Sequence, residues 1–453
     1  MATPRRGPRG RWLLGHLSEI QADQLGFYVT CAQYGDIVPV RFAARRAVVF
    51  YHPDAIEEVL VTRYRDFVKS PGTRLLRPWL GEGLLLSEGD VWQRQRRLVQ
   101  PAFHRQRMAA YGDVMTSYAA RHIADWKEGD VRDVRDEMMA LTRTIVAKTL
   151  FDAEVAYDGH EVGRASSTLM RDFGARLNSL LRLVPNWVPT PANVRVRRAI
   201  RDLDRVVYRM IADRRQSGED RGDLLSILLH AQDADDGTRM TARQVRDEMM
   251  TLFLAGHETT AVALSWTWYL LAQHPDVDTR LAEELRTVLG SRAPTAADVP
   301  RLPYTEMVVK ESMRLYPPAY ALGREAATAT EIAGHPVAAG GIAILPAWAV
   351  HRDPRWFEEP EAFCPERWEE ARARRVPRYA YFPFGGGPRQ CIGNGFAMME
   401  AVLLLAAIAQ RFRLGLVPGH RVIPTPDVTL RPEPGVRMFL SRREKDQPSR
   451  LPG

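Results

Sequence analysis

The pattern of apolar and polar positions divides the chain into a short mixed region followed by a long helical one. Within residues 1–60, the segments DIVPVRF and RAVVFYH are rich in β-branched and aromatic residues, which predicts a hairpin of two strands. A helix is predicted after Pro53, and the spacing from Gly89 to about Gly290 is typical of helices. Short strand patterns such as IAILPAW return after Pro317. The chain is therefore predicted to be mainly α-helical with small β-sheets.

Two proline-rich segments interrupt the helical pattern, SPGTRLLRPWLGEG and LVPNWVPTPANV. Each is predicted to form an irregular surface segment between helices. No internal repeat or long linker divides the chain, so we expect a single domain over residues 11–440. Residues 1–10 are predicted to form a flexible arm and residues 441–453 a flexible tail.

The longest periodic segment is TARQVRDEMMTLFLAGHETTAVALSWTWYLLAQHP. It opens with Thr241 and Gln244 in the spacing of a capping box, and Pro275 is expected to end it. At 1.5 Å per residue, about 34 residues span roughly 50 Å, the width of a whole domain. Because it is apolar nearly all round from Met249 to Leu271, the helix is expected to be buried.

A polar step, AGHETT, interrupts this apolar helix. Gly256 costs about 1 kcal/mol relative to alanine, and a buried Glu258 is expensive unless it has a partner. Thr259 and Thr260 can bond back to earlier carbonyls and bend the helix. Two interpretations stay open: a site where a small molecule binds and protons move, or close helix packing with a glutamate paired to a surface arginine. A zinc hydrolase is disfavoured because Ala261 replaces the second histidine of H-E-x-x-H.

Composition places the chain among ordinary globular proteins, with 45% apolar and 26% charged residues in a length of 453. The net charge of +8 fits an arginine-rich solvated surface, an acidic protein partner, anionic cofactor groups or an anionic membrane surface, and we expect no nucleic acid ligand. Cys31, Cys364 and Cys391 are odd in number and widely spaced, which disfavours a disulfide framework. No apolar stretch is long enough for a transmembrane anchor, and the patch at Trp12–Leu14 is too short for a signal peptide. A cytoplasmic location is expected.

The segment FGGGPRQCIGNGFA surrounds Cys391 with glycines and precedes an apolar helix. A helix N-terminus and a nearby cation such as Arg389 both favour the thiolate that ligates metals. Gly385–Gly387 and Gly393 would let the backbone approach a flat, bulky ligand. A purely structural cysteine would leave this clustering of glycines unexplained.

This segment resembles the cysteine loop of the cytochrome P450 family. The resemblance implies that Cys391 is the axial thiolate ligand of haem b, that Phe384 and Gly393 pack beside the haem, and that Arg389 binds a propionate. AGHETT is similar to the oxygen-binding helix of the family, which implies roles in oxygen and proton handling for four residues. These are Ala255, Gly256, Glu258 and Thr259.

Three further motifs occur in the order of that family. WQRQRR resembles its W-x-x-x-R helix, and LGREA resembles a segment that carries another propionate partner. KESMRLYPP and CPERW resemble its E-x-x-R and the arginine that completes a cluster of three, and Glu311 and Arg314, three residues apart, share one helix face. If buried, that cluster must be fully paired, and it is expected to brace the cysteine loop. The residues concerned are Trp92, Arg96, Arg324, Glu311, Arg314 and Arg367.

The resemblance implies the P450 fold, with a long central helix, and a monooxygenase that oxidises a lipophilic small molecule with O2, two electrons and two protons. Electrons are expected from NAD(P)H through a separate ferredoxin or flavodoxin and its reductase, with no fused reductase. A terpenoid, fatty acid or steroid-like substrate of secondary metabolism would fit, and we expect a monomer. The alternatives are a peroxide-driven peroxygenase and a non-catalytic haem sensor, and the pair Glu258–Thr259 favours the oxygen route over both.

Several segments are expected to line the substrate pocket, mostly with apolar side chains. Arg74 or Arg77 could bind a substrate carboxylate or could equally face solvent. The segments are SPGTRLLRPWLGEG, FGARLNSLLRLVPNW, TLFLAG, PPAYALG and TLRPEPGV.

Overall fold

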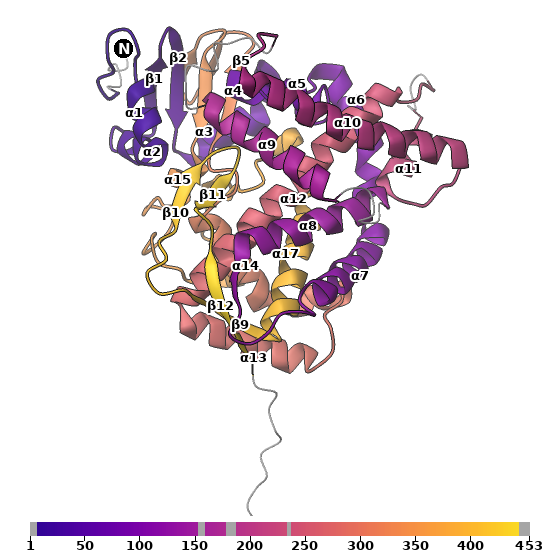
Figure 1. Ribbon diagram of the computed structural model, residues 1–453. Coiled ribbons are helices and arrows are strands. Elements are labelled where there is room, and N and C mark those ends of the chain that lie inside the picture. Colours follow the sequence, from indigo (N-terminus) through magenta and orange to yellow (C-terminus); the bar gives the residue numbers. More distant parts are fainter. Residues whose placement is uncertain (1–6, 153–158, 178–186, 233–236, 444–453) are drawn as a thin grey trace, which may run out of the picture.

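A computed structural model describes residues 7–152, 159–177, 187–232 and 237–443 of the chain. It has a small sheet-rich part, at the upper side of Figure 1, against a larger helical part. The predicted mainly helical fold with small sheets is confirmed. Each part has its own buried apolar cluster, and the larger cluster surrounds the long helix α12, Ala242–Gln273.

The principal sheet has five strands in the order β1-β2-β8-β5-β3. The predicted hairpin forms its edge as an antiparallel pair, and β2 then pairs in parallel with β8, a strand almost three hundred residues later in the chain. Its strands are β1 (Ile37–Phe42), β2 (Arg45–Phe50), β3 (Phe67–Lys69), β5 (Leu322–Ala326) and β8 (Ile342–Leu345).

Smaller sheets lie elsewhere in the chain. One has the order β4-β12-β9, and β6–β7 and β10–β11 are two-stranded. Their bounds are β4 (Val131–Asp133), β6 (Thr330–Ile332), β7 (His335–Val337), β9 (Phe412–Leu416), β10 (Ile423–Pro426), β11 (Leu430–Glu433) and β12 (Arg437–Arg442).

The remaining elements are helical. The α-helices are α1 (Leu17–Ala22), α2 (Gln24–Ala32), α3 (Pro53–Glu57), α4 (Pro71–Arg74), α5 (Arg77–Leu80), α6 (Gly89–Val99), α7 (Arg105–His122), α8 (Val134–Phe151), α9 (Gly159–Leu177), α10 (Pro191–Ser217), α11 (Leu224–His230), α13 (Pro275–Leu289), α14 (Pro303–Leu315), α15 (Ala347–Val350), α16 (Glu370–Ala373) and α17 (Asn394–Ala409). Short 3-10 or π turns are η1 (Glu58–Thr62), η2 (Tyr64–Asp66), η3 (Gln100–Phe103), η5 (Ala296–Arg301), η6 (Pro365–Trp368), η7 (Arg378–Ala380) and η8 (Gly387–Arg389).

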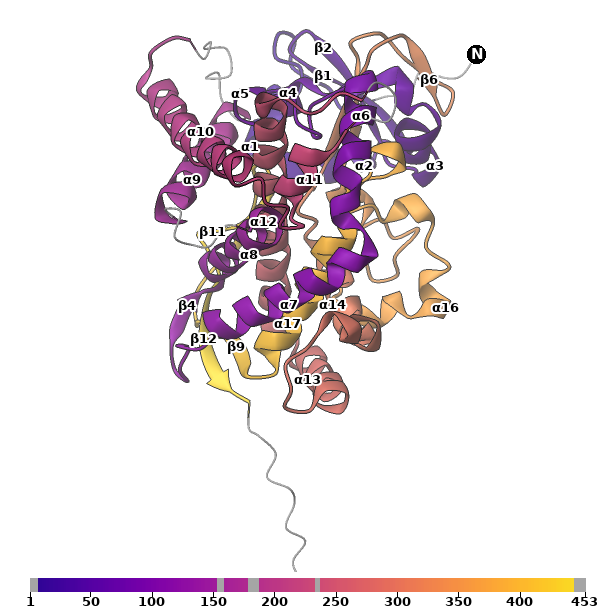
Figure 2. The same cartoon turned by 90° about the vertical axis from the view of Figure 1, so that its right-hand side faces the viewer.

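Helix α12 runs through the molecule between α8, α14 and α17 (Figures 1 and 2). Its predicted capping box is present: Gln244 N donates to Thr241 Oγ1 at 3.2 Å, and Thr241 N donates to Gln244 Oε1 at 2.9 Å. The helix ends before Pro275, as predicted, and 32 residues give it a length of about 48 Å. It passes through AGHETT as continuous α-helix, so the polar step does not break it.

One of the two proline-rich segments differs from its prediction. SPGTRLLRPWLGEG contains the short helices α4 and α5, and Trp79 and Leu80 are buried. A proline at the first turn of each helix costs no hydrogen bond, which explains why these helices form. Part of LVPNWVPTPANV lies outside the described residues, and its Pro191 begins α10.

The predicted arm at 1–10 and tail at 441–453 fall largely outside the described residues, and the single domain over 11–440 stays a prediction. Among the residues that are described, no helix combines the length and apolarity needed to cross a bilayer.

Candidate active site

A cavity of about 380 Å³ lies between α12 and the segment that carries Cys391. α12 contributes Ala255, Gly256 and Thr259, three of the residues predicted to handle oxygen and protons. The predicted cofactor residues that line the same cavity are Trp92, Arg96, Arg324, Phe384, Arg389, Cys391 and Gly393. The structure therefore brings predicted residues from four separate parts of the sequence to one space.

The cysteine loop is a tight hairpin that holds the sulfur toward the cavity. Cys391 N donates to Phe384 O at 3.0 Å, and Gly385 N donates to Phe382 O at 2.9 Å. Arg96 Nη1 donates to Gln390 O at 3.0 Å, which ties α6 to the loop. Helix α17 begins at Asn394, directly after the loop as predicted.

The electrostatics of Cys391 differ from the prediction in two ways. The cation that acts on the sulfur is Arg96, because Arg389 turns away toward Glu88. Burial raises the pKa of the Cys391 thiol, although the Gly393 N–H and Arg96 each lower it.

The glycines of the loop also have roles other than the one predicted. A Cβ on Gly387, whose φ is +63°, would lie 2.0 Å from Leu60 O, and a Cβ on Gly386 would lie 2.4 Å from the Tyr379 ring. These two glycines therefore allow close packing against the rest of the chain. Gly385 and Gly393 line the cavity, as predicted.

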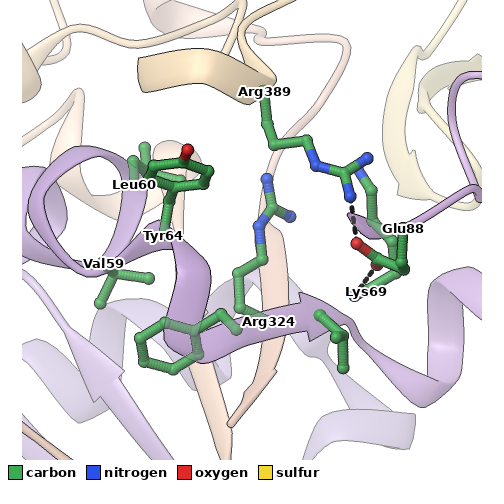
Figure 3. Close-up of a pocket in the computed structure, with 9 residues that line it drawn as sticks. Val59, Leu60, Tyr64, Lys69, Glu88, Arg324 and Arg389 are labelled. Carbon is green, nitrogen blue, oxygen red and sulfur yellow. Dashed lines mark hydrogen bonds and ion pairs between the residues drawn. The ribbon is translucent and has the colours of Figure 1, made fainter. Parts of the chain in front are cut away.

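A group of cations lies at one edge of the cavity (Figure 3). The guanidinium groups of Arg324 and Arg389 point into a shared space, and Lys69, not predicted as a site residue, lies beside them. Glu88 bridges this group: its carboxylate accepts from Lys69 N at 2.6 Å and pairs with Arg389. Arg389 also lies over the Trp92 ring at 4.1 Å.

The charges in this group do not balance. Burial and the nearby Arg389 lower the pKa of Arg324 to about 10, and burial lowers the pKa of Lys69 well below its usual range. With Arg96 there are four cationic side chains and one carboxylate, Glu88. Further carboxylates in this space would stabilise the cations, so a ligand that carries acidic groups fits here.

The side chain of Glu258 is bound by residues outside α12 rather than by its neighbour Thr259. Glu258 Oε1 accepts from Arg431 Nη2 at 2.7 Å, from Arg431 Nε at 3.0 Å and from Thr429 Oγ1 at 2.9 Å. Thr259 Oγ1 bonds back to Ala255 O at 2.7 Å, as its position in the helix predicted. Gly256 also packs closely on Val146 of α8, where a Cβ would lie 3.3 Å away. Close helix packing and a paired glutamate are therefore both present, and the site for proton movement stays a prediction.

The predicted three-residue cluster forms as one buried network. Glu311 and Arg314 have no exposed side-chain surface, and Arg314 donates to both carboxylate oxygens of Glu311 at 2.8 and 2.9 Å. Arg367 Nε and Trp368 Nε1 donate to Glu311 at 3.2 and 2.9 Å. Trp368 was not predicted, although it directly follows Arg367 in the sequence.

His351 connects this network to the cysteine loop. Arg314 Nη1 donates to His351 O at 2.9 Å, and Phe382 N donates to His351 Nε2 at 3.0 Å. Phe382 is the residue at which the loop hairpin begins, so the chain of contacts runs from Glu311 to the loop that holds Cys391. Burial, with nearby Arg314 and Arg352, lowers the pKa of His351 to about 3 and keeps it a neutral acceptor.

Some of the segments that were predicted to line the pocket do so, and others do not. TLFLAG, PPAYALG and Thr73 of SPGTRLLRPWLGEG line the cavity, together with Leu84, Leu85 and Leu150. TLRPEPGV instead supplies Thr429 and Arg431, the partners of Glu258. Most of FGARLNSLLRLVPNW lies outside the described residues.

The sequence model of the cytochrome P450 family matches residues 5–438 of the chain. The chain belongs to the cytochrome P450 family. The cyclooctatin synthase of Streptomyces melanosporofaciens is 38% identical over 96% of this chain and 95% of that protein. The cyclooctat-9-en-7-ol 5-monooxygenase of the same organism is also 38% identical, over 90% of this chain and 88% of that protein. The crystal structure of the cytochrome P450DA heme domain has a TM-score of 0.88 at 27% identity, covering 97% of this chain and 98% of that one.

Membership makes this protein a P450 monooxygenase with a haem-thiolate cofactor. The residues around the cavity fit that cofactor: an accessible sulfur faces the space, and the excess cations at its edge would pair with two propionates. Sequence reasoning missed Lys69, Glu88, His351, Trp368 and Arg431. Apart from Trp368, none lies within or directly beside a recognised motif.

We predict that Gly387→Ala weakens the cysteine loop. A side chain there must adopt a left-handed backbone and also displaces the Leu60 carbonyl, so we expect a loss of about 2 kcal/mol or more in unfolding free energy. Gly395→Ala is the matched control, because a Cβ on Gly395 meets nothing within 4 Å. Chemical unfolding measures both variants, and equal stability of the two would contradict this account.

We predict that Arg314→Met destabilises the protein by about 3–5 kcal/mol, because it leaves Glu311 buried without its main partner. The control is Arg280→Met, which removes an ion pair to Glu366 in which Arg280 is half exposed. That change is expected to cost about 0–1 kcal/mol. Thermal and chemical unfolding give both values, and a small effect of Arg314→Met would show that the network is not a brace.

We predict that His351 makes the protein acid-sensitive. Its folded pKa of about 3 lies below the unfolded value, so the unfolded chain binds the extra proton as pH falls below 6.5. Stability from this residue is complete above that pH and falls by up to about 1.4 kcal/mol per pH unit toward pH 3. His351→Asn keeps an acceptor for Phe382 and should flatten the slope of unfolding free energy between pH 5 and 7. An unchanged slope would refute the assignment.

Proposed function

We propose that this P450 inserts one atom of oxygen from O2 into a C–H bond of a neutral, apolar, terpenoid-type molecule. The observation that carries the proposal is the cavity wall between α12 and segment 318–323, which is formed by leucine, alanine, proline and glycine together with Thr251, Thr259 and Thr260 and has no charged side chain. Such a wall favours an apolar body with few polar anchors.

The cations near the cavity support a neutral substrate. Arg74 is paired with Glu325, and Arg77 with Glu82 at 2.8 Å, so neither is free to bind a carboxylate. Neither arginine lines the cavity, and among the described residues the cations that do are the four expected to bind propionates: Lys69, Arg96, Arg324 and Arg389. A fatty acid would therefore lack a partner for its carboxylate, and a terpenoid would not need one.

The names of the two Streptomyces relatives agree with this choice. One is named for cyclooctatin and the other for a monooxygenation of cyclooctat-9-en-7-ol, both of the terpenoid type. Their similarity extends over nine-tenths or more of this chain.

In the proposed mechanism Cys391 would ligate the haem iron through its sulfur, and Phe384 and Gly393 would contact the haem. The propionates would be bound by Trp92, Arg96, Arg324 and Arg389, with Lys69 as an additional cation. When bound, the haem supplies the iron at which oxygen is activated. Ala255 and Gly256 leave space for that oxygen, because neither has a side chain longer than a methyl group.

Protons are proposed to reach the site through Glu258 and Thr259. Glu258 starts in its ion pair with Arg431, so it must release Arg431 before it can take a proton from solvent and pass it toward Thr259 Oγ1. Thr259 holds its hydroxyl proton on Ala255 O at rest and can rotate to donate it into the cavity. Electrons are proposed to come from NAD(P)H through a separate ferredoxin or flavodoxin and its reductase, in the cytoplasm.

We predict that reconstituted protein shifts from low to high spin with neutral terpenoids and not with fatty acids of similar size. Turnover is expected with a generic ferredoxin system, O2 and NADPH, and not with peroxide alone. A preference for peroxide would favour the peroxygenase alternative, and spin shifts only with fatty acids would contradict the neutral substrate.

Two variants test the proposed roles of Cys391 and Thr259 in that assay. Cys391→Ser should abolish the thiolate-type band of the reduced carbon monoxide complex. Thr259→Val should retain that band and the spin shift while product per NADPH falls by about tenfold or more, since a positioned proton donor contributes about 10²–10⁴-fold. Full coupling in Thr259→Val would remove this residue from the proton path.

A further inference from the structure

Three large apolar side chains protrude from a short turn near the start of the described chain. Residues 11–15 close on themselves, because Arg11 N donates to Gly15 O and Gly15 N donates to Arg11 O, both at 2.8 Å. Trp12, Leu13 and Leu14 between them are 85%, 69% and 45% exposed. Three adjacent apolar residues at a protruding tip are unusual for a surface that contacts only water.

This turn is firmly fixed to the principal sheet. Arg41 Nη2 donates to the carbonyls of Arg11 and Trp12, and Ala43 N donates to Leu14 O at 2.9 Å. Gly15, with φ +61°, lets the turn lie against β1, since a Cβ there would be 2.0 Å from Arg41 O. The exposure of the three side chains is therefore built into the fold.

Four exposed arginines lie next to the apolar tip in the sequence or on the hairpin that contacts it. Arg9 and Arg11 flank it in sequence, and Arg45 and Arg46 lie at the end of the β1–β2 hairpin that contacts Leu14 through Ala43. Glu19 is an acid close to Arg11. Within the part of the chain that the structure describes, none of these four arginines forms an ion pair with a carboxylate.

We propose that this surface, the arginine-rimmed turn formed by Arg9, Arg11–Leu14, Arg45 and Arg46, docks on a membrane that contains anionic phospholipids. Tryptophan and leucine enter the boundary between headgroups and acyl chains, and arginines are attracted to the negative headgroups. A protein partner fits less well, because three residues at a tip fall far short of the roughly 800 Å² per partner that a stable protein interface needs. The protein would lie on the membrane without crossing it, independently of its substrate.

The test uses the haem-loaded full chain and sedimentation with vesicles. We expect binding to vesicles of phosphatidylcholine with phosphatidylglycerol, weaker binding as salt rises, and little binding to phosphatidylcholine alone. Arg45→Gln with Arg46→Gln should weaken binding about 25-fold, from roughly five-fold per arginine. Trp12→Ser with Leu13→Ser should weaken it by about 100-fold, at roughly tenfold per inserted side chain.

Val131→Ser is the matched control. Val131 is 50% exposed on β4, which lies at the opposite end of the molecule from β1 and β2 (Figure 2), and this change should leave binding unaltered. All variants should keep the wild-type melting temperature and carbon monoxide spectrum; if the double serine variant does not, Trp12→Ser alone replaces it. The proposal is overturned if wild type does not bind anionic vesicles or if the turn variants bind as wild type does. It is also overturned if wild type self-associates through the turn instead.

Discussion

The structure depends above all on a carboxylate that cannot reach water. Glu311 has no exposed surface, and the free-energy cost of burying its charge is offset because Arg314, Arg367 and Trp368 donate to it together. Arg314 also donates to three backbone carbonyls of the segment 351–362. His351 in turn accepts a hydrogen bond from Phe382 N, where the cysteine loop begins. The position of the Cys391 sulfur therefore depends on the buried charge of Glu311, which lies in a distant part of the sequence.

Glu258 is a second buried carboxylate, and it is held differently from Glu311. Glu258 is also almost fully buried, yet its partners Arg431 and Thr429 come from a β-strand region rather than from its own helix. A carboxylate held by one arginine on a separate element can be released when that element moves, whereas Glu311 is held from several sides. Glu311 is thus a structural residue, whereas Glu258 is the acid for which a role in proton transfer is proposed.

Patterns within one element were predictable from the sequence, and contacts between distant elements were not. The capping box of α12, its end before Pro275 and the hairpin β1–β2 rest on local spacing, and each formed as predicted. The direction in which Arg389 turns depends on Glu88, about 300 residues earlier, and no local signal reveals that pairing. Gly387 was expected to face the cofactor but packs on Leu60. The sequence of a motif does not show which neighbouring atoms leave no room for a side chain.

The parallel pairing of β2 with β8 has a consequence for biosynthesis. The apolar strand Arg45–Phe50 leaves the ribosome early, but its partner Ile342–Leu345 follows almost three hundred residues later. At about 5–20 residues per second, the edge of that strand waits roughly 15–60 s for its neighbour. During that interval an unpaired edge can pair with another nascent chain, so chaperone protection of the N-terminal hairpin would limit aggregation during translation.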